Sequence, residues 1–329
     1  MRAATLRILA FNRRRRGGHG TAPSFMNALH KRMRIAGIDR RGASADNRGS
    51  HRASRAHPDE PEPRMKPIAA AILPLSLLLS VCTSMNTPPV TSRPAAAANP
   101  PSLAELGAVA PALAHYASGP LMHDLWQRAG LSPRDRSIVT VSALIARNQT
   151  VELPRQLNLA LDHGVTPREI AEIVTHLAFY AGWGNAMAAV VAAKPVFDAR
   201  GIDPAQLDPE PELPLPLDEA AEAQRAAAVE QHFGTVAPGV LHYTSALLFR
   251  DLWLRAGLAP RERSLVTVSA LVANGQTAQI PYHLNRAMDN GLTREQASEA
   301  LTQLAFHAGW PSVFSAMPVF RDVFAARGD

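Results

Sequence analysis

The sequence repeats itself without a gap at an offset of 127 residues, and this constrains the fold more than any other feature. Residues 126–137 recur as residues 253–264 with few changes, and the match continues to the end of the chain. Self-similarity at a fixed period means that the chain builds one structural unit twice. We therefore predict two homologous domains, residues 102–201 and residues 229–329. A linker at 202–228, Pro- and Asp-rich in its first part, joins them.

Each copy contains the pattern of a series of helices. Thr166 is a predicted N-cap, Pro167 occupies the first helical position, and Glu169 completes a capping box. An apolar face follows, and Gly182 is expected to end this helix. The preceding helices, 136–145 and 263–272, are more uniformly apolar, which predicts burial on most sides. No alternating strand pattern appears, so the predicted fold class is all-α.

The segment between these two helices contains a proline in each copy. Pro154 and Pro281 are tolerated within the first turn of a helix, where N–H groups have no intrahelical partner. Thr150 and Thr277 are then the predicted N-caps.

Two pairs of polar residues on this helix are spaced four residues apart. They are Glu152 with Gln156 in copy one, and Gln279 with His283 in copy two. Residues at this spacing are neighbours on one helix face. Both pairs lie near a helix N-terminus, where the helix dipole favours anions. This makes the segment the best candidate for chemistry.

The positive charge of the chain lies outside the predicted domains. Residues 1–64 hold 15 Lys/Arg against five Asp/Glu, whereas the remainder holds 19 against 23. A nucleic-acid-binding fold needs a basic patch on the fold itself, so we predict no nucleic-acid partner. Residues 1–64 are interpreted as a disordered tail or a start codon placed too early. An RNA-binding arm and a twin-arginine signal are the alternatives.

Residues 65–82 have the pattern of an export signal. A short charged segment, Met65-Lys66, precedes about 13 apolar residues, too few to span a bilayer. The segment ends in Leu79-Ser-Val-Cys82, which resembles a bacterial lipobox, although Val81 replaces the usual small residue. We expect a periplasmic or lipid-anchored protein of the bacterial cell envelope. A cleaved signal with an incidental cysteine is the alternative. Residues 83–101 then form a flexible tether.

Several motifs together resemble one family. In copy two they are Pro-Arg-Glu-Arg-Ser-Leu-Val-Thr-Val-Ser-Ala-Leu-Val (260–272), Ile-Pro-Tyr-His-Leu (280–284), Gly-Leu-Thr (291–293) and Leu-Ala-Phe-His-Ala-Gly-Trp-Pro (304–311). They resemble the carboxymuconolactone decarboxylase family over about 100 residues, and copy one matches slightly less well. The resemblance implies two tandem alkylhydroperoxidase D-like helical domains.

The resemblance does not bring a thiol peroxidase activity with it. The alkylhydroperoxidase D branch uses a Cys-x-x-Cys pair and a histidine four residues later. The second cysteine maps to Gln279 and Glu152, and Cys82 is the only cysteine in the chain. Without a thiol at these positions that mechanism has no nucleophile.

The decarboxylase branch typically has a glutamate four residues before that histidine, and here the pair is split. Copy one keeps Glu152 but has Gln156, whereas copy two keeps His283 but has Gln279. Either the copies have specialised, with one active site or a composite site between them, or catalysis has been lost.

The chemistry implied by the resemblance is loss of CO2 from a carboxylated unsaturated lactone. His283 is the predicted general acid/base, and Glu152 is a second acid/base candidate. Arg263 and Arg136 are predicted to hold carboxylates. The alternatives are a hydrogen-bonded core histidine and, for the arginines, helix-start ion pairs with Asp135 or Glu262.

Further polar and aromatic residues are candidates for substrate binding. His176, Trp183 and their neighbours fall at or just past the end of the next helix and could line an aromatic pocket, although core packing is the alternative. The predicted substrate-binding residues are Tyr282, Gln279, Gln156, His307, Trp310 and Tyr180.

The predicted function is cofactor-independent decarboxylation, or related lyase or isomerase chemistry, of a small organic acid or lactone. No cofactor and no metal are expected. Membrane contact is expected only through a lipid at Cys82. A non-enzymatic envelope protein for ligand binding or assembly is the alternative. A closed interior around His283 would favour that alternative, and an open pocket holding His283 with Arg263 would count against it. We expect a homo-oligomer, a dimer or trimer of two-domain chains.

Overall fold

The computed structural model describes residues 100–207 and 213–328, and within them every regular element is a helix. The all-α prediction is confirmed. The interpretations of residues 1–64, of the export signal at 65–82 and of the tether up to residue 99 concern residues outside this description. No helix in the described part combines the length and apolar character needed to cross a bilayer.

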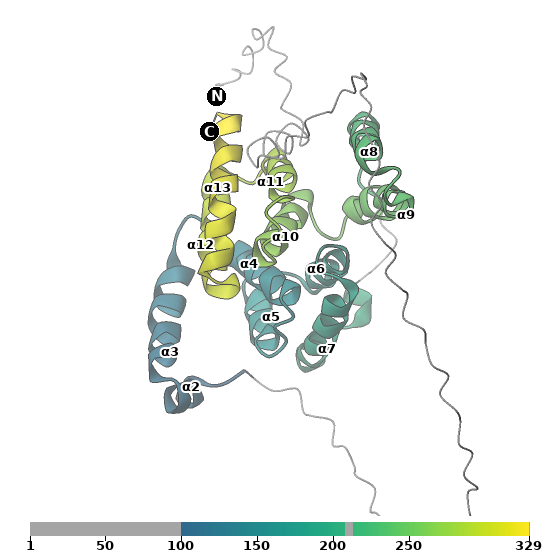
Figure 1. Ribbon diagram of the computed structural model, residues 1–329. Coiled ribbons are helices and arrows are strands. Elements are labelled where there is room, and N and C mark those ends of the chain that lie inside the picture. Colours follow the sequence, from purple (N-terminus) through teal and green to yellow (C-terminus); the bar gives the residue numbers. More distant parts are fainter. Residues whose placement is uncertain (1–99, 208–212, 329) are drawn as a thin grey trace, which may run out of the picture. The chain divides into compact units, whose positions relative to one another are not determined.

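Apart from the first helix of each copy, the α-helices repeat at the same offset as the sequence (Figure 1). Copy one consists of α2 (Leu103–Val109), α3 (Pro111–Tyr116), the π-helix η1 (Ala117–Asp124), the 3-10 turn η2 (Leu125–Gln127), α4 (Pro133–Ala146), α5 (Leu153–Asp162), α6 (Pro167–Tyr180) and α7 (Trp183–Ala199), followed by η3 (Pro204–Gln206). Copy two consists of α8 (Glu219–Phe233), α9 (Pro238–Tyr243), the π-helix η4 (Thr244–Phe249), η5 (Leu252–Leu254), α10 (Pro260–Ala273), α11 (Ile280–Asp289), α12 (Arg294–Ala308) and α13 (Trp310–Arg327).

The two central helices, α4 and α10, form the middle of a shared core. In each, the residues after the first turn are buried, including the polar ones. They pack against each other, and each also contacts the third helix of the other copy: α6 lies against α10, and α12 lies against α4. Apolar side chains of both copies belong to one continuous cluster. The predicted burial of these helices is therefore confirmed, and burial extends across the boundary between copies.

The capping of α6 and α12 follows the sequence prediction. Thr166 accepts a hydrogen bond from the Glu169 N–H, and Glu169 reaches back to the Thr166 N–H. Thr293 and Gln296 form the same box on α12. Gly182 lies just past the end of α6 at φ 100°, a conformation that favours glycine and lets the chain turn sharply into α7.

The predicted N-caps Thr150 and Thr277 are wrong by two residues. The helices begin later, with Glu152 and Gln279 at the cap position and without a side-chain cap bond. In copy two, a tight turn already uses the nearby backbone groups, because the Gln279 N–H donates to the Gln276 carbonyl. The proline consequently falls at the second helical position, still inside the first turn.

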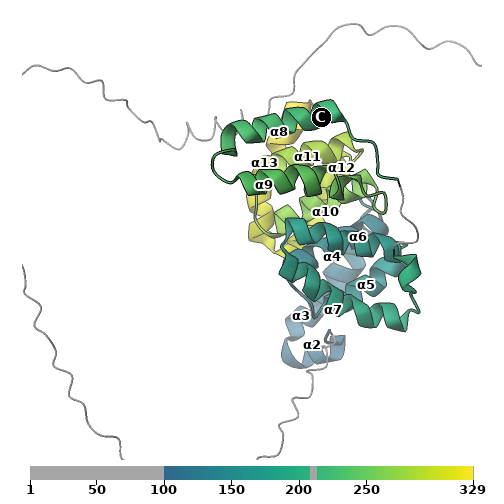
Figure 2. The ribbon, with the colours of Figure 1, turned by 90° about the vertical axis from the view of Figure 1, so that its right-hand side faces the viewer.

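The predicted linker is partly helical. Helix α8 begins at Glu219, inside the range 202–228, and packs on α9 (Figure 2). Asp218 caps it by accepting from the Ala221 N–H. The Pro- and Asp-rich composition that suggested a linker therefore applies only to the residues before α8.

Candidate functional site

One face of α6 lies over α10 of the other copy and carries three polar residues four apart: Glu172, His176 and Tyr180. The equivalent face of α12 lies over α4 and carries Glu299, Gln303 and His307. Each candidate site is therefore built from both copies. We call the site with His283 the His283 site, and the equivalent site with Gln156 the Gln156 site.

The two predicted anion-holding arginines lie beneath these faces with no exposed surface. Arg263 Nη2 donates to Glu172 Oε2 at 2.9 Å and to the Arg255 carbonyl at 2.8 Å. Arg136 Nη2 donates to Glu299 Oε2 at 2.9 Å. Each guanidinium is thus paired with a carboxylate of the other copy.

Glu172 is held between two guanidinium groups. Burial raises the pKa of its carboxyl, but hydrogen bonds from Arg255 and Arg263 outweigh burial, and the pKa lies below its usual value. Arg255 donates to Glu172 through both Nε and Nη2. An ionised Glu172 therefore satisfies the charge of Arg263.

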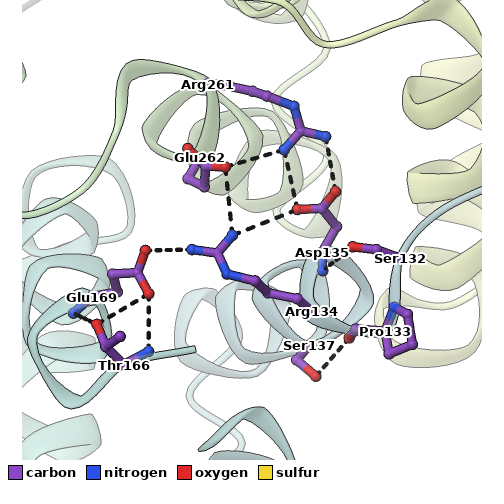
Figure 3. A network of polar contacts seen from close by, with 9 residues as sticks. All are labelled: Ser132, Pro133, Arg134, Asp135, Ser137, Thr166, Glu169, Arg261 and Glu262. Carbon is purple, nitrogen blue, oxygen red and sulfur yellow. Dashed lines mark hydrogen bonds and ion pairs between the residues drawn. The ribbon is translucent and has the colours of Figure 1, made fainter. Parts of the chain in front are cut away.

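The alternative partners considered for Arg136 and Arg263 belong to a different network (Figure 3). Asp135 accepts from Arg261 at 2.8 and 3.1 Å, and Arg261 also contacts Glu262 at 3.3 Å. Arg134 contacts Asp135, Glu262 and Glu169. The helix-start acids Asp135 and Glu262 thus pair with Arg134 and Arg261, and these ion pairs join the first turns of α4, α10 and α6.

The tautomer of His176 follows from its partners. Thr267 Oγ1 donates its proton to the Arg263 carbonyl, so it accepts from His176 Nε2 at 2.7 Å. His176 Nδ1 is then free of hydrogen and accepts from Arg263 Nη1 at 3.4 Å. Burial, with Arg263 next, holds the pKa of His176 well below its usual value. His176 is a neutral bridge between the copies.

Gln303 makes the same bonds in the other half of the molecule. Its Oε1 accepts from Arg136 at 3.2 Å, and its Nε2 donates to Thr140 Oγ1 at 3.0 Å. An amide can replace an imidazole here because each offers one donor and one acceptor at the required places. This position is therefore structural in both copies.

His283 lies among aromatic rings of both copies. Its ring is stacked with Trp253 at a centroid distance of 6.1 Å, and the rings of Tyr180 and Tyr282 meet it edge-on at 5.2 and 5.0 Å. Tyr180 comes from α6 of copy one, and its hydroxyl accepts from Trp253 Nε1 at 2.8 Å. Among the predicted substrate-binding residues, Tyr180 and Tyr282 are thus brought to His283.

The imidazole of His283 is neutral at ordinary pH. Burial, with Arg286 next, lowers its pKa to about 3. Its Nδ1 atom is buried and has no hydrogen-bond partner in the described part of the chain. A hydrogen-bonded core histidine would have used this atom.

Sequence reasoning missed Arg286, which lies one turn after His283 on α11. Its guanidinium carbon lies 4.2 Å from the centroid of the Trp253 ring and 5.6 Å from that of Phe249. The 127-residue offset carried the signal, because Arg286 replaces Leu159 of copy one.

The Gln156 site contains an acid instead. Gln156 Nε2 donates to Glu152 Oε1 at 2.8 Å, and Arg155 forms an ion pair with the same oxygen. His307 faces this site from α12; burial, with Arg155 next, lowers its pKa to about 4. Gln303 Nε2 lies 3.4 Å from His307 Nε2.

Three of the predicted residues are exposed. One is Gln279, whose carbonyl accepts from the His283 N–H at 3.4 Å along the helix backbone. Trp183 and Trp310 are 66% and 51% exposed. Trp310 lines a groove of about 600 Å³ between α12 and α13, together with Phe306 and Phe314. The aromatic cluster at His283 is therefore made by other rings.

Comparison with known proteins gives matches in both copies. A model of the carboxymuconolactone decarboxylase family matches residues 111–195 and 238–322. The chain is 34% identical over 87 residues to 4-carboxymuconolactone decarboxylase of Acinetobacter baylyi, covering 26% of this chain and 65% of that protein. It is 34% identical over 70 residues to nitrosuccinic acid decarboxylase of Metarhizium robertsii, covering 21% of this chain and 49% of that protein. The matched segments thus span less than two thirds of either relative.

Proposed function

Because the chain belongs to the carboxymuconolactone decarboxylase family, we propose that it removes CO2 from a small unsaturated organic acid or lactone without a cofactor. Both similar proteins are named as decarboxylases. The observation that carries the proposal is the state of His283, which is neutral, enclosed by rings of both copies and, among the described residues, unpartnered at Nδ1.

His283 is the proposed general acid/base. Loss of CO2 leaves an electron pair on the reacting carbon, which the conjugated system delocalises until a proton is added. A neutral imidazole carries one N–H and one lone pair, so it can take up a proton from water at one nitrogen and deliver a proton to the carbon. A bound anion stabilises the imidazolium form, so substrate binding raises the pKa of His283 toward the working pH.

Arg263 and Arg136 contribute indirectly in this proposal. Both are committed to carboxylates of the other copy, Glu172 and Glu299. They fix α6 over α10 and α12 over α4, and so hold Tyr180 against His283. Glu152 remains the proposed acid/base group of the Gln156 site, where Gln156 donates to it.

The test uses the purified full chain and measures CO2 release from 4-carboxymuconolactone and nitrosuccinate. General acid–base groups contribute roughly 10²- to 10⁴-fold to a rate, so His283→Gln should lower turnover by at least about 100-fold. Glutamine is a suitable replacement because copy one already has Gln156 at the equivalent helix position. Glu152→Gln is the matched variant for the other site. No CO2 release by the wild-type chain from either compound would refute the proposed activity on these substrates.

The alternative function, ligand binding or assembly without catalysis, also has structural support. His283 is only 8% exposed, and Arg263 is fully buried and paired with Glu172, so neither side chain is openly exposed to solvent. The CO2 assay separates the alternatives, since a binding protein would retain its ligand unchanged.

Location and assembly remain proposals. The pattern at 65–82 supports export to the cell envelope with lipid attachment at Cys82. The exposed aromatic residues Phe306, Trp310 and Phe314, which line one groove, support a homo-oligomer, because contiguous exposed apolar surface commonly marks an interface. Palmitate labelling and the mass of the protein in solution test the two proposals separately.

A further inference from the structure

Arg286 is a partly buried cation with no counter-ion in the part of the chain that the structure describes. Within residues 100–207 and 213–328 its side chain forms no ion pair or hydrogen bond, and its Nε atom is buried. Neighbouring Arg225, by contrast, donates twice to Glu222 at 2.7 Å. A charged group removed from water without a partner is unfavourable, so an unpaired guanidinium at this place indicates that an anion is missing.

The surroundings of Arg286 suit an anion. The Tyr180 hydroxyl accepts from Trp253 Nε1, and its own proton has no acceptor in the described residues. His283 Nδ1 is likewise without a partner there. Arg225 lies 4.2 Å from the centroid of Phe249, the ring that Arg286 also contacts, and its charge is matched by Glu222. Among the described residues, the positive charge of Arg286 is thus not matched by a negative charge. It lies near the Tyr180 hydroxyl and His283 Nδ1, which can each form a further hydrogen bond.

We propose that Arg286 binds the carboxylate of the substrate, over the face of Trp253 and beside His283. This inference rests on the decarboxylase function proposed above and adds a recognition residue to it. A guanidinium presents parallel N–H groups that match the two oxygens of a carboxylate. Packing on the indole, 4.2 Å away, holds its position and leaves its edge for the ligand.

The two sites differ at the position of Arg286. The position equivalent to Arg286 in copy one is Leu159, and the position equivalent to Tyr282 is Arg155. Arg155 is already paired with Glu152. The Gln156 site therefore contains its own carboxylate, whereas no carboxylate of the described residues pairs with Arg286.

The test measures binding by calorimetry, with the full chain and two probes that do not lose CO2. These are paraconate, a saturated lactone carboxylate, and its uncharged methyl ester. Arg286→Leu should weaken paraconate binding by about 10- to 100-fold, the range for losing a hydrogen bond to a charged group. It should leave the weaker ester binding unchanged. Leucine is compatible with this helix, because Leu159 occupies the equivalent position.

Two further variants complete the design. Arg286→Lys keeps the charge but loses the paired N–H groups, so its affinity should fall between those of the wild type and Arg286→Leu. Arg321→Leu removes the same charge from an exposed position on α13, beside Asp322, and should bind paraconate as the wild type does.

The outcomes separate this inference from the proposed function. Paraconate binding that depends on Arg286, in a chain that releases no CO2, would support the carboxylate site and refute the decarboxylase. Wild-type affinity for paraconate in Arg286→Leu would overturn the inference, whether or not CO2 is released. So would an equal loss of ester binding, or no binding of paraconate to the wild type.

Discussion

Glu172→Gln should destabilise the whole described fold, not one copy alone. The substitution preserves shape but removes the charge that neutralises Arg263, which has no exposed surface. Removing one member of a buried ion pair generally costs about 3–5 kcal/mol. Arg263 would keep its bond to the Arg255 carbonyl at 2.8 Å, and the amide oxygen would still accept, so we expect about 3 kcal/mol.

Glu299→Gln is the matched control at the equivalent position. The Glu299 side chain is 12% exposed against 5% for Glu172, and its second partner, Arg128, is 46% exposed. Water can therefore replace part of what is lost, and we expect about 1–2 kcal/mol.

The assay is urea unfolding of the full chain, followed by far-UV circular dichroism and by tryptophan fluorescence. With a denaturant slope of about 3 kcal/mol/M, Glu172→Gln should shift the midpoint by about 1 M and Glu299→Gln by roughly half as much. Trp126 and Trp253 are buried, one in each copy, so fluorescence reports on both. Two separate transitions, with only one displaced, would refute the idea that the ion pair stabilises both copies together.

Three smaller perturbations test His283, the helix caps and the network at the start of α4. The pKa of His283 is about 3 in the fold against 6.5 for the free side chain, so between these pH values the unfolded chain binds more protons than the folded one. The free energy of unfolding should therefore be highest above about pH 6.5 and fall by about 2 kcal/mol at pH 5. Urea midpoints of His283→Gln should depend less on pH. Thr166→Ala and Thr293→Ala each remove a helix N-cap and should lower the free energy of unfolding by about 1 kcal/mol. Thermal denaturation should show a similar loss of stability for both variants. Asp135→Asn weakens the two bonds from Arg261 and should cost about 1–3 kcal/mol by the same measurement; an unchanged melting temperature would show that the network in Figure 3 contributes little.

Much of the fold was predictable because its determinants are local or repeated. The caps at Thr166 and Thr293 depend on residues three apart, and the burial of α4 and α10 follows from their composition. The cap of α11 was misplaced at Thr277, because the turn before it takes up backbone groups that the sequence pattern assigned to the helix.

The arrangement between copies was not predictable from the repeat. The 127-residue offset identifies Glu172 and Glu299 as equivalent positions. It does not indicate that each residue packs on the central helix of the other copy. The partner of Arg263 is 91 residues away in the sequence, and no local pattern connects the two. Arg286 was missed for a different reason, since it departs from the repeat and does not belong to a motif that both copies share.

The packing of α6 and α12 on the central helix of the other copy has a consequence for how such a molecule can evolve. In an assembly of identical single-domain subunits, every substitution appears at all equivalent positions at once. Here the duplicated unit is encoded twice, so His176 and Gln303, or Arg286 and Leu159, can be selected independently. Each cluster contains side chains from both halves, but every position is encoded separately. One mutation therefore alters one cluster and leaves its counterpart intact. Fusion of the duplicated units thus allows two chemically different sites to evolve on a scaffold that is nearly symmetric.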